Sequence, residues 1–477
     1  MRAPPGMTLV VDAPSTYLPE RRYILDVVLG EWLGLDWDLR LGPRPDVRIT
    51  LNGDTALGFV VLPDVLFGME PRRWLAPASL PARPTAWRPV SGTRMGPDGD
   101  ERLPILYGPD APAATLLADE DSAVRVGVDI FGSAFFMVSR YEELVDETRD
   151  TFGRFPASSS LAHSEGFLRL PIVDAYVEVL WHALHRQWPG LERRPRQFRV
   201  ALTHDVDRPL SFIGRTIPDL LRDLGADVLR RGDARLMAKR VRSWIRIPRG
   251  DYRLDPDNTF DFLMAVSERS GIASAFYFLA TEHSSSALDG KYSLDDPWIR
   301  SLMARIHARG HEIGFHAGFL TYRDPGRTQD EFERLRAALA ELGVSQERWG
   351  GRQHYLLWEN PRTWSNWEAA GLQYDSTLGF ADQVGFRLGT SHELPVFNVH
   401  ERRALRLCER PLIVMDGTLF EYMKLAPDAA AQTVLDMARQ CRRYDGTLTL
   451  LWHNSSLPTI AEQRWYESVI DTVASGS

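Results

Sequence analysis

The stretch RVALTHDVDRP, residues 199–209, decides how the second half of the chain is interpreted. Its first five residues alternate and favour a β-strand, and Pro209 prevents that strand from continuing. His204, Asp205 and Asp207 therefore lie at or just past the carboxyl end of the strand. Aspartate is rare within strands, and two carboxylates this close repel each other unless a cation or a proton lies between them. A turn whose aspartates bond their own backbone is the alternative.

The composition is that of a globular protein with more than one domain. A chain of 477 residues is too long for one ordinary core. Hydrophobic residues make up 44% and charged residues 25%, which is unlike a disordered or fibrous chain. No apolar run approaches the roughly 18 residues of a membrane span, and the proline-broken N-terminus does not resemble a signal peptide. Cys408 and Cys441 have no metal-type spacing, and we expect a cytoplasmic protein.

The charge balance bears on partners. A formal net charge of −8 argues against a nucleic-acid-binding protein. Residues 230–253 depart from this balance because they are strongly basic. Two interpretations of this segment stay open: a solvated helical face, or a patch that contacts an anionic polymer or the surface of a membrane.

The first domain is expected to span residues 1–195 and the second residues 196–477. In the first, apolar runs predict strands at 47–53 and 57–67, and helical spacing predicts a helix at 172–188. No catalytic constellation is evident in this domain. Its histidines are scattered and fit surface or packing positions.

After a linker at residues 189–197 the pattern becomes regular, because strand-like runs that end in polar residues alternate with helical runs. The predicted strands are 199–207, 273–280, 311–317, 348–355, 372–379, 412–419 and 447–454. The predicted helices are 258–270, 297–309, 329–342, 427–443 and 459–474. This alternation predicts an α/β fold with a parallel, barrel-like sheet.

Polar side chains collect at the carboxyl ends of these strands, where barrel enzymes place their catalytic groups. The residues in question are Asp205, Asp207, His316, Arg352, His354, Asp375 and His453. Any one of them would be unremarkable, but their shared position at one rim is hard to explain by packing. The sequence therefore predicts an active site there.

The order of these motifs resembles the polysaccharide deacetylases, the NodB-homology proteins of carbohydrate esterase family 4, over about residues 198–475. The resemblance implies a distorted (β/α)7 barrel, preceded here by a smaller α/β N-terminal domain. It also implies removal of N-acetyl groups from a sugar or polysaccharide with a divalent metal, usually zinc. The segment FFMVSRYEE, residues 135–143, is similar to the end of an N-terminal domain of unknown function in a bacterial branch of this family.

The first two motifs of the family concern the base and the metal. THDVD matches the first, and the resemblance implies that Asp205 is the general base and Asp207 a metal ligand. GHEIGFH matches the second and makes His316 a metal ligand.

The later motifs concern the oxyanion and the acid. RQHY stands where most members have Arg-Pro-Pro-Tyr, which implies that Arg352 holds the base and that the backbone N–H of Tyr355 serves the oxyanion. YDSTLG places Asp375 where many members have an aspartate, and LLWHN makes His453 the general acid. We also expect Asn454, the next residue, to contact the substrate.

The chemistry of amide hydrolysis is compatible with these roles. It needs an activated water, a stabilised oxyanion and a proton for the leaving amine. A metal with three protein ligands and an open position supplies the first and much of the second. A carboxylate kept ionised by Arg352 can accept the proton of the water, and a histidine such as His453 can donate a proton near neutrality.

One position departs from the family pattern, because Leu320 stands where a second metal-binding histidine is usual. A catalytic zinc normally has three protein ligands, so one is needed besides Asp207 and His316. We expect it to be His354, which ends the strand that follows that of His316. His204 is the closest alternative, but its side chain should point to the opposite side of its strand.

Three functions stay open from the sequence. The first is a metal-dependent carbohydrate N-deacetylase, the second a degenerate member that binds glycan without hydrolysis, and the third a C–N hydrolase of a non-sugar amide. The missing histidine favours the second function. The presence of Asp205, Arg352 and His453 together favours an enzyme, since a binding module needs no acid and base.

Overall fold

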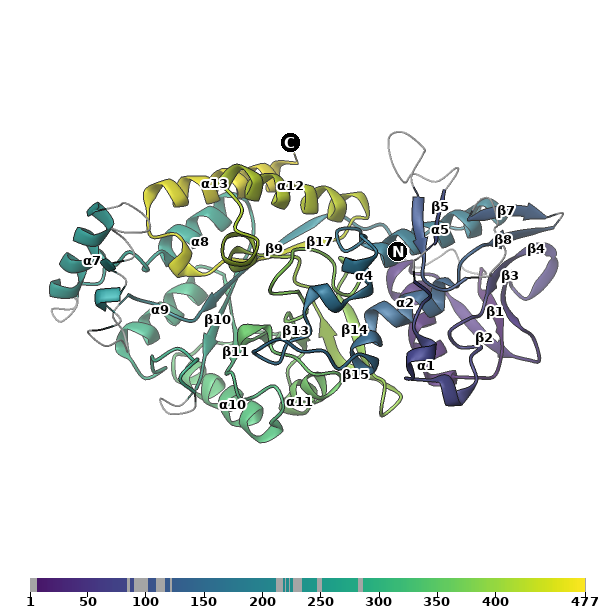
Figure 1. The fold of residues 1–477 in the computed structure, drawn as a ribbon, viewed down its shortest axis with the longest axis horizontal. Coiled ribbons are helices and arrows are strands. Elements are labelled where there is room, and N and C mark those ends of the chain that lie inside the picture. The colour runs from purple at the N-terminus through teal and green to yellow at the C-terminus, as the bar shows by residue number, and fades with distance from the viewer. Residues whose placement is uncertain are drawn as a thin grey trace. The chain divides into compact units, whose positions relative to one another are not determined.

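The computed structural model divides the chain into two compact units (Figure 1). The described residues are 7–83, 86–89, 102–108, 116–120, 122–211, 218, 220–222, 224–225, 234–246, 251–281 and 286–476. The first unit comprises Met1–Phe198, Gly385–Arg406 and Gln440–Gly446, and the second comprises Arg199–Val384, Leu407–Arg439 and Thr447–Ser477. Compared with the division expected after residue 195, the first unit also includes two segments from late in the sequence.

The first unit is built on a six-stranded mixed sheet with the strand order β2-β1-β3-β4-β8-β7. In it β1 is parallel to β2 and antiparallel to β3. The strands are β1 (Leu9–Ala13), β2 (Trp37–Leu41), β3 (Asp46–Leu51), β4 (Asp54–Pro63), β7 (Leu117–Glu120) and β8 (Ala123–Val126), with a separate pair β5 (Ala86–Pro89) and β6 (Arg102–Ile105). The strands predicted at 47–53 and 57–67 correspond to β3 and β4.

The helices of the first unit are α1 (Leu18–Leu25), α2 (Ile130–Val138), α3 (Glu142–Val145), α4 (Leu161–Ser164) and α5 (Ile172–Gln187). Every residue of α2 is buried, as expected of a helix that is apolar on all sides. Asp129 caps α2, because its carboxylate accepts the backbone N–H of Gly132 at 2.8 Å. Helix α5 is the one predicted at 172–188.

Buried charges attach the first of the late segments to the rest of the first unit. Glu143 accepts hydrogen bonds from Arg140 at 2.8 Å and from Arg387 at 2.6 Å, and all three side chains are almost inaccessible. Asp174 on α5 accepts the hydroxyl of Ser391 at 2.7 Å. Contacts between buried charged and polar side chains leave no hydrophobic periodicity in the sequence. The sequence pattern therefore could not assign Gly385–Arg406 to the first unit.

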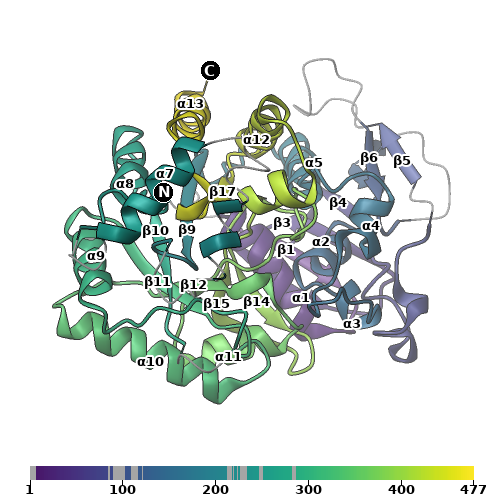
Figure 2. The same cartoon turned by 60° about the vertical axis from the view of Figure 1, so that its left-hand side comes forward.

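The chain also forms a curled, nine-stranded sheet with the order β14-β15-β13-β12-β11-β10-β9-β17-β16 (Figure 2). Its strands belong to the second unit except for β14 and the first residues of β15, which fall in the segment Gly385–Arg406 of the first unit. The strands of this sheet are β9 (Arg199–Val206), β10 (Ala275–Leu279), β11 (Glu312–Ala317), β12 (Gly350–Gln353), β13 (Tyr374–Asp375), β14 (Leu394–Asn398), β15 (Arg403–Glu409), β16 (Val414–Met415) and β17 (Thr447–Leu451). All the predicted strands are present, and β14 and β15 are additional. Among the described residues the sheet ends at β14 and β16, so a closed (β/α)7 barrel is not seen there.

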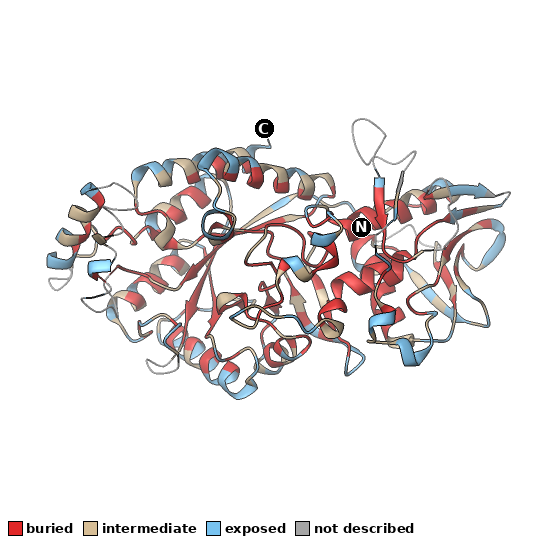
Figure 3. Ribbon diagram, viewed as in Figure 1, coloured by how far each residue is buried: buried red, intermediate tan, exposed pale blue. Residues whose placement is uncertain are grey.

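The helices of the second unit are α7 (Ala234–Arg246), α8 (Phe260–Arg269), α9 (Pro297–Ala308), α10 (Pro325–Glu341), α11 (Arg362–Ala370), α12 (Pro427–Arg443) and α13 (Ile460–Ser475). The five predicted helices are present, and α7 and α11 are additional. Figure 3 shows buried and exposed residues sharing single helices, as amphipathic cover of a sheet requires. Within the described ranges, none of the helices has the length and hydropathy of a membrane span.

Parallel pairing brings the predicted site residues to one edge of the sheet. Strand β9 is parallel to β10 and β17, and β11 is parallel to β10 and β12. In register, Asp205 is level with Tyr277, and His316 is level with Arg352. The carboxyl ends of neighbouring parallel strands meet at the same edge, so their terminal side chains converge.

We predict that Arg387→Ala lowers the free energy of unfolding of the first unit by about 3–5 kcal/mol, because it leaves the buried Glu143 carboxylate short of a partner. Urea unfolding followed by tryptophan fluorescence measures this. The matched control is Arg403→Ala, which removes an ion pair with Glu401 whose side chains are 47% and 50% exposed; it should cost less than about 1 kcal/mol. Equal effects of the two variants would contradict a structural role for the Glu143 cluster.

Candidate active site

Three ligand-type side chains converge beyond the ends of β9, β11 and β12. One ligand atom from each of Asp207, His316 and His354 lies within 4.8 Å of the others. The Nε2 atom of His316 is 3.0 Å from Asp207 Oδ1, and that of His354 is 3.5 Å from Asp207 Oδ2. The structure thus brings together the residues for which the sequence predicted metal binding.

The hydrogen bonding of this cluster fits a cation. His316 Nε2 and Asp207 Oδ1 are both buried, yet they do not have the geometry of a hydrogen bond with each other or with any other group among the described residues. Buried polar atoms are nearly always bonded, so two orphaned atoms facing each other indicate a missing partner. Two imidazoles and one carboxylate are a donor set that zinc accepts, with a fourth position left open.

Each imidazole is oriented through its other nitrogen. His316 Nδ1 is 2.9 Å from the carbonyl oxygen of Arg352, and His354 Nδ1 is 2.8 Å from Asp289 Oδ1. Asp289 also accepts the backbone N–H of Phe319 at 2.8 Å. With Nδ1 donating, the lone pair of each Nε2 is directed to the shared position, as in metal sites whose histidines are held by outer partners.

Two carboxylates make this position strongly favourable for positive charge. Burial alone lowers the pKa of His354, but Asp207 and Asp289 outweigh it and raise that pKa to about 9. His354 would therefore carry a proton if no other cation were bound. The site is electrostatically prepared for a cation of one kind or the other.

A second cluster holds Asp205. One carboxylate oxygen accepts a hydrogen bond from Arg352 at 2.9 Å, and the other lies 3.8 Å from His316 Nε2. The guanidinium of Arg352 also donates to Thr203 Oγ1 at 3.0 Å and to the carbonyl oxygen of Ser376 at 2.8 Å, and it is wholly buried. Asp205 is thus fixed by Arg352 on one side and faces the metal-type cluster on the other.

His453 approaches the same cluster from β17. Its Nε2 is 3.5 Å from Asp207 Oδ2, and its Nδ1 is 2.7 Å from Asp416 Oδ1. Burial alone would lower the pKa of His453, but Asp416 and then Asp207 raise it to about 10. The imidazole therefore carries a proton at neutral pH and presents it toward the centre of the site.

Sequence reasoning did not select Asp289 or Asp416. Asp416 lay inside the strand predicted at 412–419, but β16 ends at Met415, so Asp416 directly follows the carboxyl end of its strand. Asp289 lies in the loop before α9 and had only a Leu-Asp-Gly turn to mark it. Its role depends on a loop meeting His354 in space, which no local pattern encodes.

Three other candidate residues occupy supporting positions. Asp375 is buried and accepts the backbone N–H of Thr377 at 3.0 Å, and burial raises its pKa to about 7. The Asn454 amide donates to backbone carbonyls of Arg208 at 2.9 Å and Asp257 at 2.7 Å, so it braces the loop after β9. The backbone at Tyr355 is left-handed, with φ 60°. A non-glycine residue there stores about 1–3 kcal/mol of strain, a feature that is frequent near active sites.

His204 and Leu320 lie apart from the ligand cluster. His204 is fully buried, its Nδ1 is 2.8 Å from the carbonyl oxygen of Trp452, and its ring packs on Phe276. Burial lowers its pKa to about 4, so it is a neutral packing residue. Leu320 is 41% exposed. His354, and neither His204 nor Leu320, therefore lies in the cluster with Asp207 and His316.

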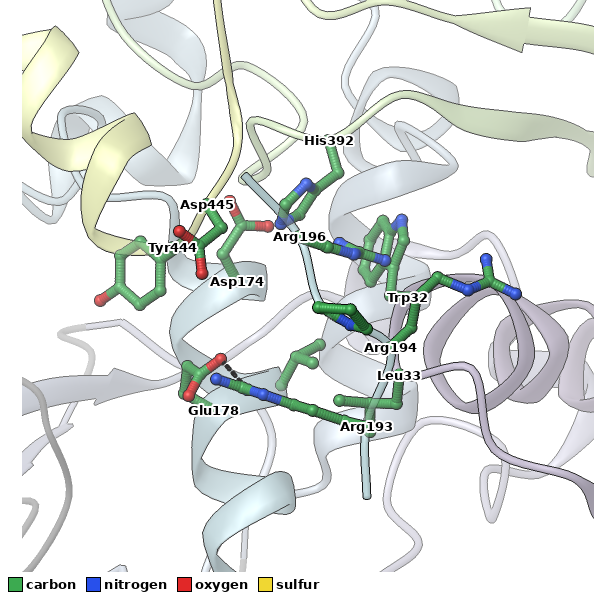
Figure 4. Close-up of a pocket in the computed structure, with 12 residues that line it drawn as sticks. Trp32, Leu33, Asp174, Glu178, Arg193, Arg194, Arg196, His392, Tyr444 and Asp445 are labelled. Carbon is green, nitrogen blue, oxygen red and sulfur yellow. Dashed lines mark hydrogen bonds and ion pairs between the residues drawn. The ribbon is translucent and has the colours of Figure 1, made fainter. Parts of the chain in front are cut away.

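The first unit has a cavity of its own, of about 230 Å³, with a charged lining (Figure 4). Arg193, Arg194 and Arg196, from the predicted linker, line it together with Asp174 and Glu178 of α5. Arg193 forms an ion pair with Glu178, and Asp174 accepts hydroxyl hydrogen bonds from the late segment. Basic and acidic groups offset each other here, and we assign the cavity no part in the chemistry.

Residues 9–189 match a family of unknown function (DUF7033), which covers less than half of the chain. A comparison with curated proteins finds no match. Among solved structures, the chain is similar to a protein from Mycobacterium smegmatis assigned as a polysaccharide deacetylase, with 18% identity, 59% of this chain and 85% of that one covered, and a TM-score of 0.38.

Two further structures are similar over the same part of the chain. One is a family 4 carbohydrate esterase from Streptomyces lividans in complex with acetate, which is 12% identical in sequence. The similarity covers 59% of this chain and 91% of the esterase chain, with a TM-score of 0.29. The other is PuuE allantoinase, which is 11% identical in sequence. The similarity covers 59% of this chain and 85% of the allantoinase chain, with a TM-score of 0.35. All these TM-scores are below 0.5, so the functional proposal has to rest on the site itself.

We predict that Asp289→Asn weakens zinc binding about 10–100-fold, because the acceptor that orients His354 and raises its basicity is lost. Competition with a chromogenic chelator measures the affinity. The matched control is Asp295→Asn, an exposed aspartate in the same loop, which should bind zinc like the wild type. Unchanged affinity in Asp289→Asn would show that His354 is not a ligand.

Proposed function

We propose that the chain is a metal-dependent hydrolase that removes N-acetyl groups from an N-acetylated sugar or polysaccharide. The observation that carries the proposal is the placement of a three-residue ligand cluster between an arginine-held carboxylate and a charged histidine. Amide hydrolysis needs a base and an acid on either side of an electrophilic centre.

The ligand cluster has the residues to hold the metal. Asp207, His316 and His354 would bind a divalent cation, zinc being favoured by the two imidazoles. When bound, such a cation polarises the substrate carbonyl and lowers the pKa of a water molecule.

Asp205 is the candidate general base. Arg352 holds the carboxylate in place through a 2.9 Å hydrogen bond to one oxygen. The other oxygen lies 3.8 Å from His316 Nε2 and can accept the proton of a water bound there. Since Arg352 has three further hydrogen bonds, the base cannot swing away from this position.

His453 is the candidate general acid. Asp416 fixes its Nδ1 and stabilises the imidazolium, which leaves Nε2 to deliver a proton to the leaving amine. His453 need not bind the metal, because His354 completes the ligand set. The cluster thereby weakens the case for a degenerate, glycan-binding protein, which had rested on Leu320.

The sugar substrate is supported by the resemblance of the motifs THDVD, GHEIGFH, RQHY and LLWHN to those of carbohydrate deacetylases. The geometry alone serves any accessible amide. A C–N hydrolase of a non-sugar amide would use the same groups, so the substrate class has to be decided by assay.

The proposal predicts that zinc-loaded protein releases acetate from N-acetylated oligosaccharides, and that chelation abolishes the release and zinc restores it. Acetate is measured by a coupled assay on a panel of N-acetylglucosamine oligomers, with elemental analysis of the same samples. Non-sugar acetamides and cyclic ureides form the comparison panel. Release from that panel alone would replace the sugar substrate, and zinc-replete protein inactive on both panels would refute the hydrolase.

We further predict different outcomes for the two aspartates of the first motif. Asp205→Asn should retain zinc but lose about 10²–10⁴-fold in turnover, because only the proton acceptor is removed. Asp207→Asn should lose both zinc and activity. Asp295→Asn again serves as the control. Equal loss of zinc in both variants would mean that the two roles are reversed or shared.

A further inference from the structure

Helix α7 carries three kinds of side chain on three faces, and Figure 3 shows that both buried and exposed residues occur along it. At about 100° per residue, its buried residues fall on one face: Leu236, Arg240 and Ser243. A second face, roughly 120° wide, holds only apolar side chains: Ala234, Met237, Ala238, Val241, Trp244 and Ile245. The third face holds only cationic side chains: Arg235, Lys239, Arg242 and Arg246.

Polar contacts fix the buried face in place. Arg240 donates a hydrogen bond to Ser211 Oγ at 2.7 Å, and the Ser243 hydroxyl donates to Asp255 at 3.3 Å. Asp255 in turn accepts the backbone N–H of Ser211 at 3.1 Å. The helix is therefore held to the loop after β9 by its polar side.

The apolar face is most exposed at the last turn of the helix. Trp244 is 48% exposed and Ile245 is 54% exposed, and they are neighbours on one helix. Met237, Ala238 and Val241 beside them are partly exposed as well. Single exposed apolar residues are normal, but two large ones side by side on a helix that polar contacts anchor elsewhere indicate an interaction surface.

The adjoining face supplies the charge. Arg242 is exposed, and Arg246 is exposed with an ion pair of 3.4 Å to Asp251. Lys239 lies closer to the anchoring side, where burial lowers its pKa and Asp255 opposes that effect. The face is cationic on a chain whose formal net charge is −8, so its sign is opposite to that of the whole molecule.

We propose that α7 binds a membrane surface that contains anionic lipids, with Trp244 and Ile245 among the acyl chains and Arg242 at the level of the phosphates. A stripe without polar side chains bordered by arginines requires an apolar medium next to fixed negative charge, and an anionic lipid surface offers both. A soluble polyanion would pair with the arginines but leave Trp244 and Ile245 in water. The proposal does not depend on the hydrolase activity.

The test is sedimentation of the full-length protein with vesicles of phosphatidylcholine alone or with added phosphatidylglycerol. We expect binding to the anionic vesicles only, and weaker binding at high salt. Arg242→Gln/Arg246→Gln should bind roughly 25-fold more weakly, since each basic residue near such a surface contributes about fivefold. Trp244→Ser/Ile245→Ser should bind more than about tenfold more weakly even at low salt.

Two matched controls lie on other helices. Ile460→Ser on α13 removes an isoleucine that is 68% exposed, and Arg439→Gln on α12 removes an exposed arginine. Both should bind vesicles like the wild type, and circular dichroism verifies the fold of every variant. Absence of binding to anionic vesicles, or equal losses in the control variants, would overturn the proposal.

The same experiments distinguish other binding partners of α7 from a membrane. Binding to dextran sulfate that is as tight as to vesicles and insensitive to Trp244→Ser/Ile245→Ser would assign the helix to a soluble polyanion. Dimerisation without vesicles that is lost in the α7 variants would assign it to a second copy of the chain. Either result would overturn the membrane proposal.

Discussion

A guanidinium ion that is removed from water must have its N–H groups hydrogen-bonded, or its burial costs several kcal/mol. Arg352 satisfies this requirement with Asp205, Thr203 and Ser376, which come from β9 and from the loop after β13. Its carbonyl oxygen meanwhile orients His316 of β11 at 2.9 Å. One residue of β12 therefore sets the position of both the candidate base and a candidate ligand. Displacing Asp205 or His316 would disturb the hydrogen bonds of Arg352, and a buried guanidinium that loses hydrogen bonds is costly.

The three histidines around Asp207 are distinguished by what holds their Nδ1 atoms. His316 has a neutral carbonyl oxygen, whereas His354 and His453 have the carboxylates of Asp289 and Asp416. A carboxylate stabilises positive charge on its imidazole, and both of these pKa values are raised. The raised pKa values therefore do not tell which of His354 and His453 is the candidate ligand and which the candidate acid. Their positions do, because the cluster of possible metal ligands contains His354 and not His453.

Much of the second unit could be predicted because parallel strands are short apolar runs with conspicuous ends. The residues at those ends form the candidate site, and His354 could be placed beside Asp207 and His316 from its position at the rim. What could not be predicted depends on distant segments meeting. Asp289 reaches His354 from a loop, and Arg387 joins Glu143 across 244 positions of sequence. Strands β14 and β15 were missed, since no neighbouring helix marks them as a repeating unit.

The discontinuous make-up of the first unit has a consequence for how the protein is made. Its core requires Gly385–Arg406 and Gln440–Gly446, which leave the ribosome long after Met1–Phe198. Until then the Glu143 carboxylate has no Arg387, and α2, every residue of which is buried in the finished unit, belongs to an incomplete core. Domains normally fold as units during synthesis, the N-terminal one first. Here the N-terminal segment can complete its contacts with Gly385–Arg406 and Gln440–Gly446 only after nearly the whole chain has been made.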